Sequence, residues 1–490
     1  MDQREETASQ VSEALPALAP ASHLAPQVES GSYQGILSLA APLVLSTTGF
    51  MLMHLLDAIF LAKHSKEAIA ASAPAGMAGF TIVSFFSGVT GYVATFVAQY
   101  MGARRPERIG AAVWQALYLA VASALLTAAL GFLAEPLFRL VGHEERLQAI
   151  EVRYFQIICW TALLPFLSVT LSAFFLGRGD NTIVMVVQLC GLVINGFLSY
   201  ALIFGKFGLP SWGAPGAAGA TAIAQGLVVI PLAILFLRPE YRRTYRTWSA
   251  RALEIPLLRR LIRFGLPDGT RFTVEMMAYT LFVCIVGRLG TAELAATNIA
   301  WRINGFAFFP LIGLSRAVAT VVGHAQGRNE PQTAEHATYR GLLISQVWML
   351  IAAALFLLVP RPMLQLFTAH GEGPEEAARA LELGVELLRF VALYCILDGL
   401  NIVFLGALQG AGDTRWTSVV SVSFNAVFVS VELAMDHCHA TLNQLWAVMT
   451  FTVMAQALIW LARFRAGHWK KMRVIEAPAD VSTECRSTEY

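Results

Sequence analysis

The chain has 490 residues, of which 56% are hydrophobic and only 14% are charged, whereas a soluble protein carries about 25% charged residues. Apolar runs of about 20 residues, the length that a helix needs to cross a bilayer, recur throughout the sequence. These features exclude an ordinary soluble domain and predict an all-α polytopic membrane protein. The net charge of +2 gives no reason to expect a nucleic-acid partner.

The first 34 residues begin with acidic side chains and are rich in Ala, Pro and Ser. They lack the basic stretch followed by an apolar core that is typical of a secretory signal peptide. We interpret residues 1–34 as a disordered cytoplasmic tail, because such a composition buries too little apolar surface to fold.

Twelve apolar segments follow, and each is long enough to form a membrane-spanning helix. They lie at 35–62, 69–100, 109–134, 154–176, 183–204, 217–237, 260–288, 292–322, 340–360, 386–409, 416–435 and 444–464. We expect an N-terminal six-helix lobe at 35–237, a basic cytoplasmic linker at 238–259, a C-terminal six-helix lobe at 260–465 and a cytoplasmic tail at 466–490.

Arginine is concentrated in the loops that follow even-numbered spans, for example at Arg104, Arg105 and Arg328, and in the central linker. Cytoplasmic loops of membrane proteins carry an excess of Lys and Arg. The distribution therefore predicts that the even loops and both termini are cytoplasmic.

The two halves of the chain repeat each other at one offset. Pro42 matches Pro267 and Gly102 matches Gly327, and each pair is 225 residues apart. The motif GRGDN at 177–181 recurs as GAGDT at 410–414. Each half holds an even number of spans, so the halves point the same way. We expect a pseudo-two-fold axis along the membrane normal.

Three acids inside predicted spans have no counterpart in the other half: Asp57, Glu275 and Asp398. The repeat places Phe50 opposite Glu275 and Phe282 opposite Asp57. A charged side chain in a span costs at least about 2.5 kcal/mol, so it usually serves a function. We therefore interpret the three acids as ion-coupling residues, with a structural ion pair or a helix cap as the alternative for each.

Polar neighbours lie one helical turn from these acids. His54 precedes Asp57, Arg271 precedes Glu275, and Tyr394 and Asn401 flank Asp398. We interpret Asp268 as an acid in the first turn of its helix, and Asp180 and Asp413 as turn or cap residues. The intramembrane residues Arg302, Arg316 and Glu432 receive no role. The polar run 436–439 is interpreted as a solvated loop rather than as a metal site.

These residues resemble the multidrug and toxin extrusion (MATE) family of secondary transporters, particularly its NorM-like branch. The resemblance rests on LAAPLVLSTTGFMLMHLLDAIFLA around Asp57, on QYMGARRPE, GRGDN and GAGDT, on GKFGLPSWGAPGAAGATAIAQ from Gly205, and on RFGLPDGTRFTVE up to Glu275. It covers about residues 35–465. It implies two six-helix lobes around a central cavity that opens alternately to either side. It also implies export of organic, often cationic compounds in exchange for Na+ or H+.

The resemblance assigns residues to sites. It implies that Glu275, Tyr394 and Asp398 form a second-lobe cation site and that Asp57 is the first-lobe acid. Asn195 and Thr221 match polar positions of the first lobe, but relatives carry an acid about one turn after that Asn, where this chain has Ser199. Aromatic residues at Phe50, Phe272 and Phe306 are expected to contact substrate. Arg271 would repel a second cation, so H+ is favoured over Na+ as the coupling ion.

Two other functions remain open from the residues alone. One is a lipid-linked oligosaccharide flippase of the same wider fold. The other, of a different class, is a membrane-embedded lipid-modifying enzyme, although the sequence has neither an HxxxH motif nor an Asp-rich cluster. We expect a transporter rather than an enzyme, with no cofactor apart from the coupling ion. Its expected place is the bacterial inner membrane, as a monomer whose partners are small organic substrates and the lipid bilayer.

Overall fold

The computed structural model describes residues 31–141, 144–366 and 374–476, and within these ranges the secondary structure is helical, with no strand. Most of the predicted N-terminal tail lies outside them. The first half holds α3 (Tyr33–His64), α4 (Lys66–Gly91), α5 (Val93–Gly102), the 3-10 turn η1 (Pro106–Arg108), α6 (Ile109–Gly131), α7 (Ala134–Val141), α8 (Glu145–Trp160), α9 (Leu163–Arg178), α10 (Asn181–Phe204) and α11 (Ala214–Phe236).

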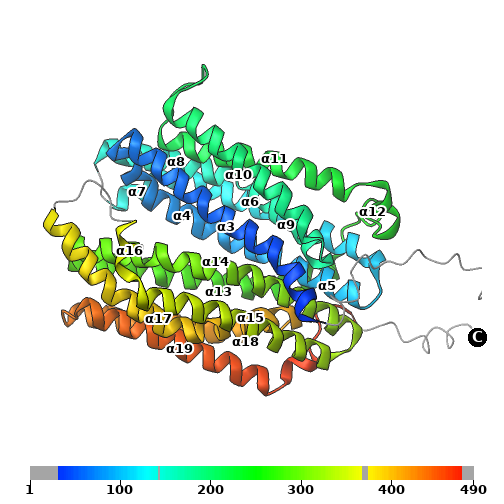
Figure 1. Cartoon of the computed structure of the whole chain (residues 1–490). Helices are drawn as coiled ribbons and strands as arrows, with labels where there is room; N and C mark the ends of the chain where they lie inside the picture. The colour runs from blue at the N-terminus through cyan, green and yellow to red at the C-terminus, as the bar shows by residue number, and fades with distance from the viewer. Residues whose placement is uncertain (1–30, 142–143, 367–373, 477–490) are drawn as a thin grey trace, which may run out of the picture.

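The short helix α12 (Pro239–Thr244) lies in the predicted linker. The second half holds α13 (Ile255–Leu289), α14 (Thr291–Arg328), α15 (Pro331–Leu358), α16 (Pro360–Gln365), α17 (Pro374–Ala411), α18 (Thr414–His437), α19 (Leu442–Arg465) and the 3-10 turn η2 (His468–Lys471). Figure 1 shows the first half as one bundle and the second half as another beside it.

The number of membrane-spanning helices agrees with the prediction. In the part of the chain that the structure describes, eleven helices are long and apolar enough to cross a membrane, and α8 with α9 makes a twelfth if the pair, bent by 41°, counts as one span. The predicted fourth span, 154–176, is therefore a broken helix. Backbone groups freed at such a break are tolerated at membrane depth where neighbouring helices cover them.

Helix α13 begins at Ile255, inside the segment predicted to be a linker. Pro256 lies in its first turn, where the missing N–H of proline has no helical partner to lose. Pro267 lies in the interior of the same helix. The helix therefore begins five residues before the predicted span at 260–288.

Glycines that the repeat pairs with each other bring α5 and α14 together. A Cβ atom at Gly102 would lie 2.0 Å from the carbonyl oxygen of His324, and one at Gly327 would lie 2.2 Å from that of Gln99. Lipid tails are as apolar as leucine, so transmembrane helices associate mainly through such close packing of small residues. We call this crossing the lobe seam.

The second repeated motif also has the same structure in both halves. Gly179 and Gly412 have φ of 88° and 103°, values that favour glycine. Each is followed by an aspartate at the N-cap position, Asp180 for α10 and Asp413 for α18. Their carboxylates accept from arginine instead of capping the helix: Arg178 Nη2 lies 2.7 Å from Asp180, and Arg463 Nε lies 2.8 Å from Asp413.

The first helix of each lobe starts against the opposite lobe. Ile36 and Leu39 of α3 belong to the hydrophobic core built mainly by the second half. Leu257 and Leu261 of α13 belong to a core of the first half. Both described ends of the chain lie at this end of the bundle, beside α5 (Figure 1). The two lobes are therefore held together at the end where the predicted cytoplasmic arginines gather.

Candidate functional site

Three charged residues share one face of α13, at spacings of three and four. Asp268 is the fourteenth residue of a helix that begins at Ile255, so the interpretation of Asp268 as a first-turn acid is wrong. Arg271 is 8% exposed. Its Nη1 atom donates to Glu275 Oε2 at 2.7 Å, and its Nε atom lies 3.4 Å from Asp268 Oδ1. The guanidinium thus bridges two carboxylates within the membrane.

Asp268 contacts other helices of the second lobe, and one of its partners also reaches the first lobe. The side chain of Gln409 in α17 donates a hydrogen bond to Asp268 Oδ1. The hydroxyl of Tyr92, between α4 and α5, donates to the Gln409 carbonyl at 2.8 Å. Arg316 of α14 interacts electrostatically with Asp268. These contacts of Asp268 could not be predicted from the sequence, because Gln409 is 141 residues away and lies on another helix, as does Arg316.

Asp398 lies in α17 and is 4% exposed. Asn401 donates to it at 3.2 Å, and the indole of Trp460 donates to the Asn401 carbonyl oxygen at 2.7 Å. Asp398 interacts electrostatically with Glu275, and Tyr394 interacts with Asp398. The structure therefore brings the predicted second-lobe residues together.

We call Asp268, Arg271, Glu275, Tyr394 and Asp398 the second-lobe cluster. An aromatic wall lies close to it: Tyr279 stacks on Trp301 with ring centroids 3.8 Å apart, and Tyr279 interacts with both Tyr394 and Arg302. Arg302 thus faces an aromatic hydroxyl near this cluster.

The first lobe holds a different group of polar side chains. Asp57 of α3 faces Ser199 of α10 and interacts with Tyr154 of α8. One turn away on α10, Asn195 donates to the Thr221 hydroxyl of α11 at 3.1 Å. We call Asp57, Asn195, Ser199 and Thr221 the first-lobe cluster.

Two oxygens of the first-lobe cluster have no donor among the described residues. Asp57 Oδ1 and Asn195 Oδ1 are buried without a hydrogen-bond partner there, while the Ser199 hydroxyl lies beside the Asp57 carboxylate. A buried acceptor left unpaired costs about 1–3 kcal/mol, so such a group calls for an explanation. A proton, a water or a cation would satisfy these oxygens. The side chain of the predicted neighbour His54 lies outside the described residues.

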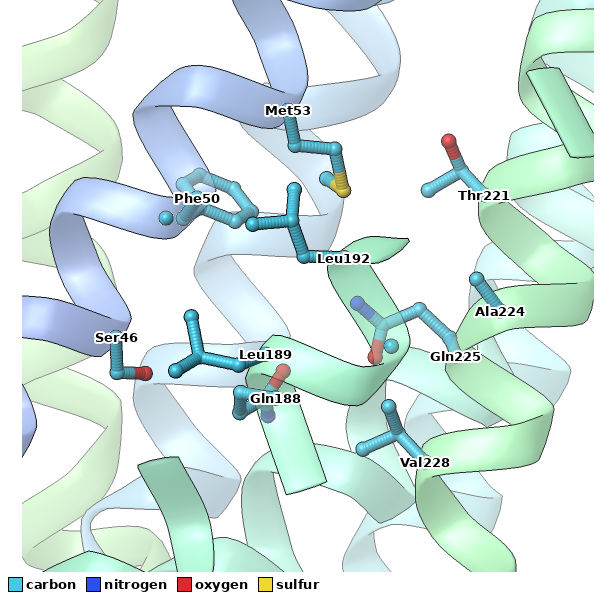
Figure 2. A pocket seen from close by; sticks show the side chains of 12 residues that line it. Ser46, Phe50, Met53, Gln188, Leu189, Leu192, Thr221, Ala224, Gln225 and Val228 are labelled. Carbon is cyan, nitrogen blue, oxygen red and sulfur yellow. The ribbon is translucent and has the colours of Figure 1, made fainter. Parts of the chain in front are cut away.

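A small cavity opens between α3, α10 and α11 in the same lobe (Figure 2). Its volume is about 30 Å³, which is room for about two water molecules. Figure 2 shows Phe50 of α3 facing Leu189 and Leu192 of α10, with Thr221 and Gln225 on the α11 side. Phe50 therefore lines a small cavity, and the substrate contacts expected at Phe50, Phe272 and Phe306 all stay predictions.

In the described ranges, no three His, Cys, Asp or Glu side chains converge in a way that could hold a metal ion.

Glu432 of α18, which the sequence left without a role, is 1% exposed, and neither carboxylate oxygen has a hydrogen-bond partner among the described residues.

The MatE family model matches residues 42–201 and 270–431, one segment in each half. The "Probable multidrug resistance protein NorM" of Pseudomonas putida (strain KT2440) is 33% identical over 404 residues, which are 82% of this chain and 86% of that protein. The "Multidrug resistance protein NorM" of Burkholderia vietnamiensis is 31% identical over 379 residues, which are 77% and 81% of the two chains.

Solved structures share the fold at lower identity. A MOP superfamily transporter from Pyrococcus furiosus, described as having a binding pocket of reverse polarity, superposes with a TM-score of 0.82 at 20% identity, over 91% of this chain and 98% of that one. An outward-facing multidrug resistance MATE family transporter gives a TM-score of 0.80 at 19% identity, over 93% and 100%. These two similarities establish the two-lobed helical fold.

Proposed function

Because the chain belongs to the MatE family of transporters, we propose that it is a secondary active multidrug efflux transporter that exports organic, often cationic compounds by antiport through alternating access. The relatives named as multidrug resistance proteins, similar over most of both chains, support this proposal. Membership in a transporter family also supports this function over the lipid-modifying enzyme considered above.

We place the arginine-rich end of the bundle in the cytoplasm of a bacterial inner membrane. Arg104, Arg105 and Arg328 lie at this end, where α5 and α14 finish. The positive-inside rule supports the placement. Both chain ends would then be cytoplasmic.

The observation that carries the mechanism is the ion pair of Arg271 with Glu275, 2.7 Å long. The guanidinium acts as a built-in counter-ion for Glu275 and disfavours Na+ beside it through charge repulsion. A proton needs no coordination shell. A proton that enters from outside would neutralise Glu275. Arg271 would then keep its ion pair with Asp268, whose Oδ1 atom lies 3.4 Å from Arg271 Nε. H+ is therefore the coupling ion that we propose.

Transport then follows from differential binding to two states. Protonation of Glu275 and Asp398 favours the state that releases substrate outside. A cationic substrate from the cytoplasm competes with the protons for the same carboxylates. Moving one net charge across 100 mV supplies about 2.3 kcal/mol, enough to drive a useful gradient.

The test is transport by the purified protein in proteoliposomes under a pH gradient, with no Na+ present. Accumulation of a cationic dye under these conditions is the expected result. Accumulation only after Na+ is added would overturn H+ as the coupling ion. Growth of an efflux-deficient bacterium that expresses the chain, against a panel of cationic dyes and antibiotics, identifies the substrates, and no protection against any of them would contradict multidrug export.

A further inference from the structure

The segment after α19 leaves the second lobe and crosses to the first. We call residues 468–476 the C-terminal strap. Its anchor is Trp469, which is fully buried and stacks on Phe464 of α19 with ring centroids 4.7 Å apart. Gln326 of α14 donates to the Trp469 carbonyl at 2.7 Å. This end of the strap is therefore held by the second lobe.

The middle of the strap is buried in the first lobe. Val474 is 0% exposed and Ile475 is 5% exposed, and both belong to the hydrophobic core that α5, α6 and α9 help to build. The Val474 N–H donates to Gln99 Oε1 of α5 at 2.9 Å, while Gln99 Nε2 donates back to the Gly410 carbonyl of α17 at 3.1 Å. One glutamine thus ties strap, first lobe and second lobe together.

The strap ends, within the described residues, on a basic surface. The Tyr100 hydroxyl donates to Glu476 Oε2 at 2.7 Å. The Glu476 carboxylate also lies 3.6 Å from Arg108 and 3.8 Å from Arg260, with Arg105 at 4.0 Å. The carboxylate remains one-third exposed, so water reaches this contact and its ion pairs are weak individually.

The strap lies over the lobe seam. The glycine pair Gly102 and Gly327, where α5 and α14 touch, lines a pocket of about 460 Å³ whose remaining wall includes Arg473, Ile475 and Glu476. The pocket beside Glu476 leaves room for this end of the strap to move. Val474 and Glu476 thus attach to the first lobe a strap whose other end, at Trp469, is held by the second.

We propose that the C-terminal strap is a latch that keeps the cytoplasmic side closed and must leave the first lobe before the central cavity opens to the cytoplasm. The proposal rests on the alternating access proposed above. It makes the attachment of Val474 and Glu476 a determinant of the balance between the two states, although neither residue belongs to the ion-coupling clusters.

The first experiment locks the latch. Arg105→Cys and Glu476→Cys are introduced together into a full-length chain whose native cysteines are replaced, and a short bismaleimide joins them. We expect export to stop on cross-linking and to continue in the untreated double variant and in treated single-cysteine variants. Export at an unchanged rate by the cross-linked protein would overturn the latch.

The second experiment releases the latch. Spin labels at the exposed positions Arg243→Cys of α12 and Gln332→Cys of α15 report the distance between the lobes at the cytoplasmic end. Glu476→Gln should raise the cytoplasm-open fraction by about threefold, and Val474→Ala, which removes apolar surface from a fully buried position, should raise it further. Glu335→Gln is the matched control, because it removes an ion pair with Lys470 that stays within the second lobe.

The outcomes separate the two proposals. A wild-type distance that changes with pH or substrate, with strap variants that match Glu335→Gln, overturns the latch and leaves alternating access standing. A wild-type distance that never changes contradicts alternating access itself, and the latch falls with it.

Discussion

The two lobes share a scaffold but not a polar interior. In the second-lobe cluster, Arg271 supplies a positive charge within 2.7 Å of Glu275 and 3.4 Å of Asp268. In the first-lobe cluster, Asp57 and Asn195 each present a buried oxygen that has no donor among the described residues. The second lobe thus carries its own counter-ion, whereas the first-lobe cluster consists of one acid and neutral polar side chains. The difference indicates that the repeat builds the framework and that each lobe adds its own ion chemistry.

The largest effect is expected where the second-lobe carboxylates are removed. Glu275→Ala or Asp398→Ala should reduce dye export to the level of cells without the transporter, because either change deletes a group that must exchange proton for substrate. Insertion and folding should persist, since Arg271 keeps Asp268 as a partner after the loss of Glu275. Dye efflux and protein level in the membrane are measured together.

The matched control is Glu386→Gln, which neutralises an exposed carboxylate that accepts from Asn443 outside both clusters. Wild-type export by both alanine variants would show that the second-lobe cluster does not couple transport. Equal loss of export in the control would point to a general effect of charge.

The fold was largely predictable from the sequence, because hydrophobic length and the repeat are local patterns. The close approach of α5 and α14 at the lobe seam follows the pairing of Gly102 with Gly327. The break between α8 and α9 was not predicted, although Pro165 stands four residues after Thr161 and therefore cannot donate the helical hydrogen bond to the Thr161 carbonyl.

Within the candidate site, only contacts between residues of the same helix could be predicted from the sequence. Glu275 with Arg271, and Asp398 with Asn401, are neighbours at one helical turn and can be read from spacing. The contact of Asp268 with Gln409 depends on how α13 packs against α17. Asp268 was predicted to lie in the first turn of its helix, whereas α13 begins thirteen residues earlier, at Ile255. Side-chain contacts between distant helices leave no periodic signal in one sequence.

Removing the built-in counter-ion should make the second lobe respond to Na+. In Arg271→Gln, Asp268 and Glu275 lose the charge that now lies between them, so their carboxylates attract a cation from solution. We expect H+-driven transport to fall by about tenfold, which corresponds to about 1.4 kcal/mol, and added Na+ to restore part of it. The measurement is dye uptake into proteoliposomes with and without Na+.

Arg288→Gln serves as the control for Arg271→Gln, because Arg288 pairs with Asp436 at an exposed position near the end of α13. It should transport without Na+ like the wild type. If dye uptake by the Arg271→Gln protein does not change when Na+ is added, Arg271 is not a counter-ion that excludes Na+. The difference between the two lobes would then not be one of charge.

Adding a second acid to the first-lobe cluster should create a site that binds a cation. Ser199→Asp places a second carboxylate opposite Asp57 among oxygens that have no donor. We expect Na+ to stabilise this variant by about 1.4 kcal/mol at a concentration tenfold above its Kd, seen as a rise in the melting temperature of the purified protein. The double variant Asp57→Asn with Ser199→Asp should lose the response, and a response that survives there would place the cation elsewhere.

The smallest effect concerns Glu476, a carboxylate that lies outside the membrane spans and outside both clusters. Burial raises the pKa of Glu476, but the hydrogen bond from Tyr100 and the charges of Arg108 and Arg260 lower it more, so the pKa lies below its usual 4.5. An acid with a lowered pKa stabilises the folded protein above pH 4.5, and this contribution is lost as the pH falls through the folded-state pKa.

Because the Glu476 side chain is 33% exposed, solvent screening limits this contribution to less than about 1 kcal/mol. Glu476→Gln should therefore melt about 1 °C below the wild type at neutral pH, and the difference should disappear as the pH falls below 4.5, when the wild-type carboxylate becomes neutral as well. Melting curves of both proteins across this range provide the measurement. A difference that stays constant down to the lowest pH would mean that shape and hydrogen bonding, rather than charge, hold Glu476 on the first lobe.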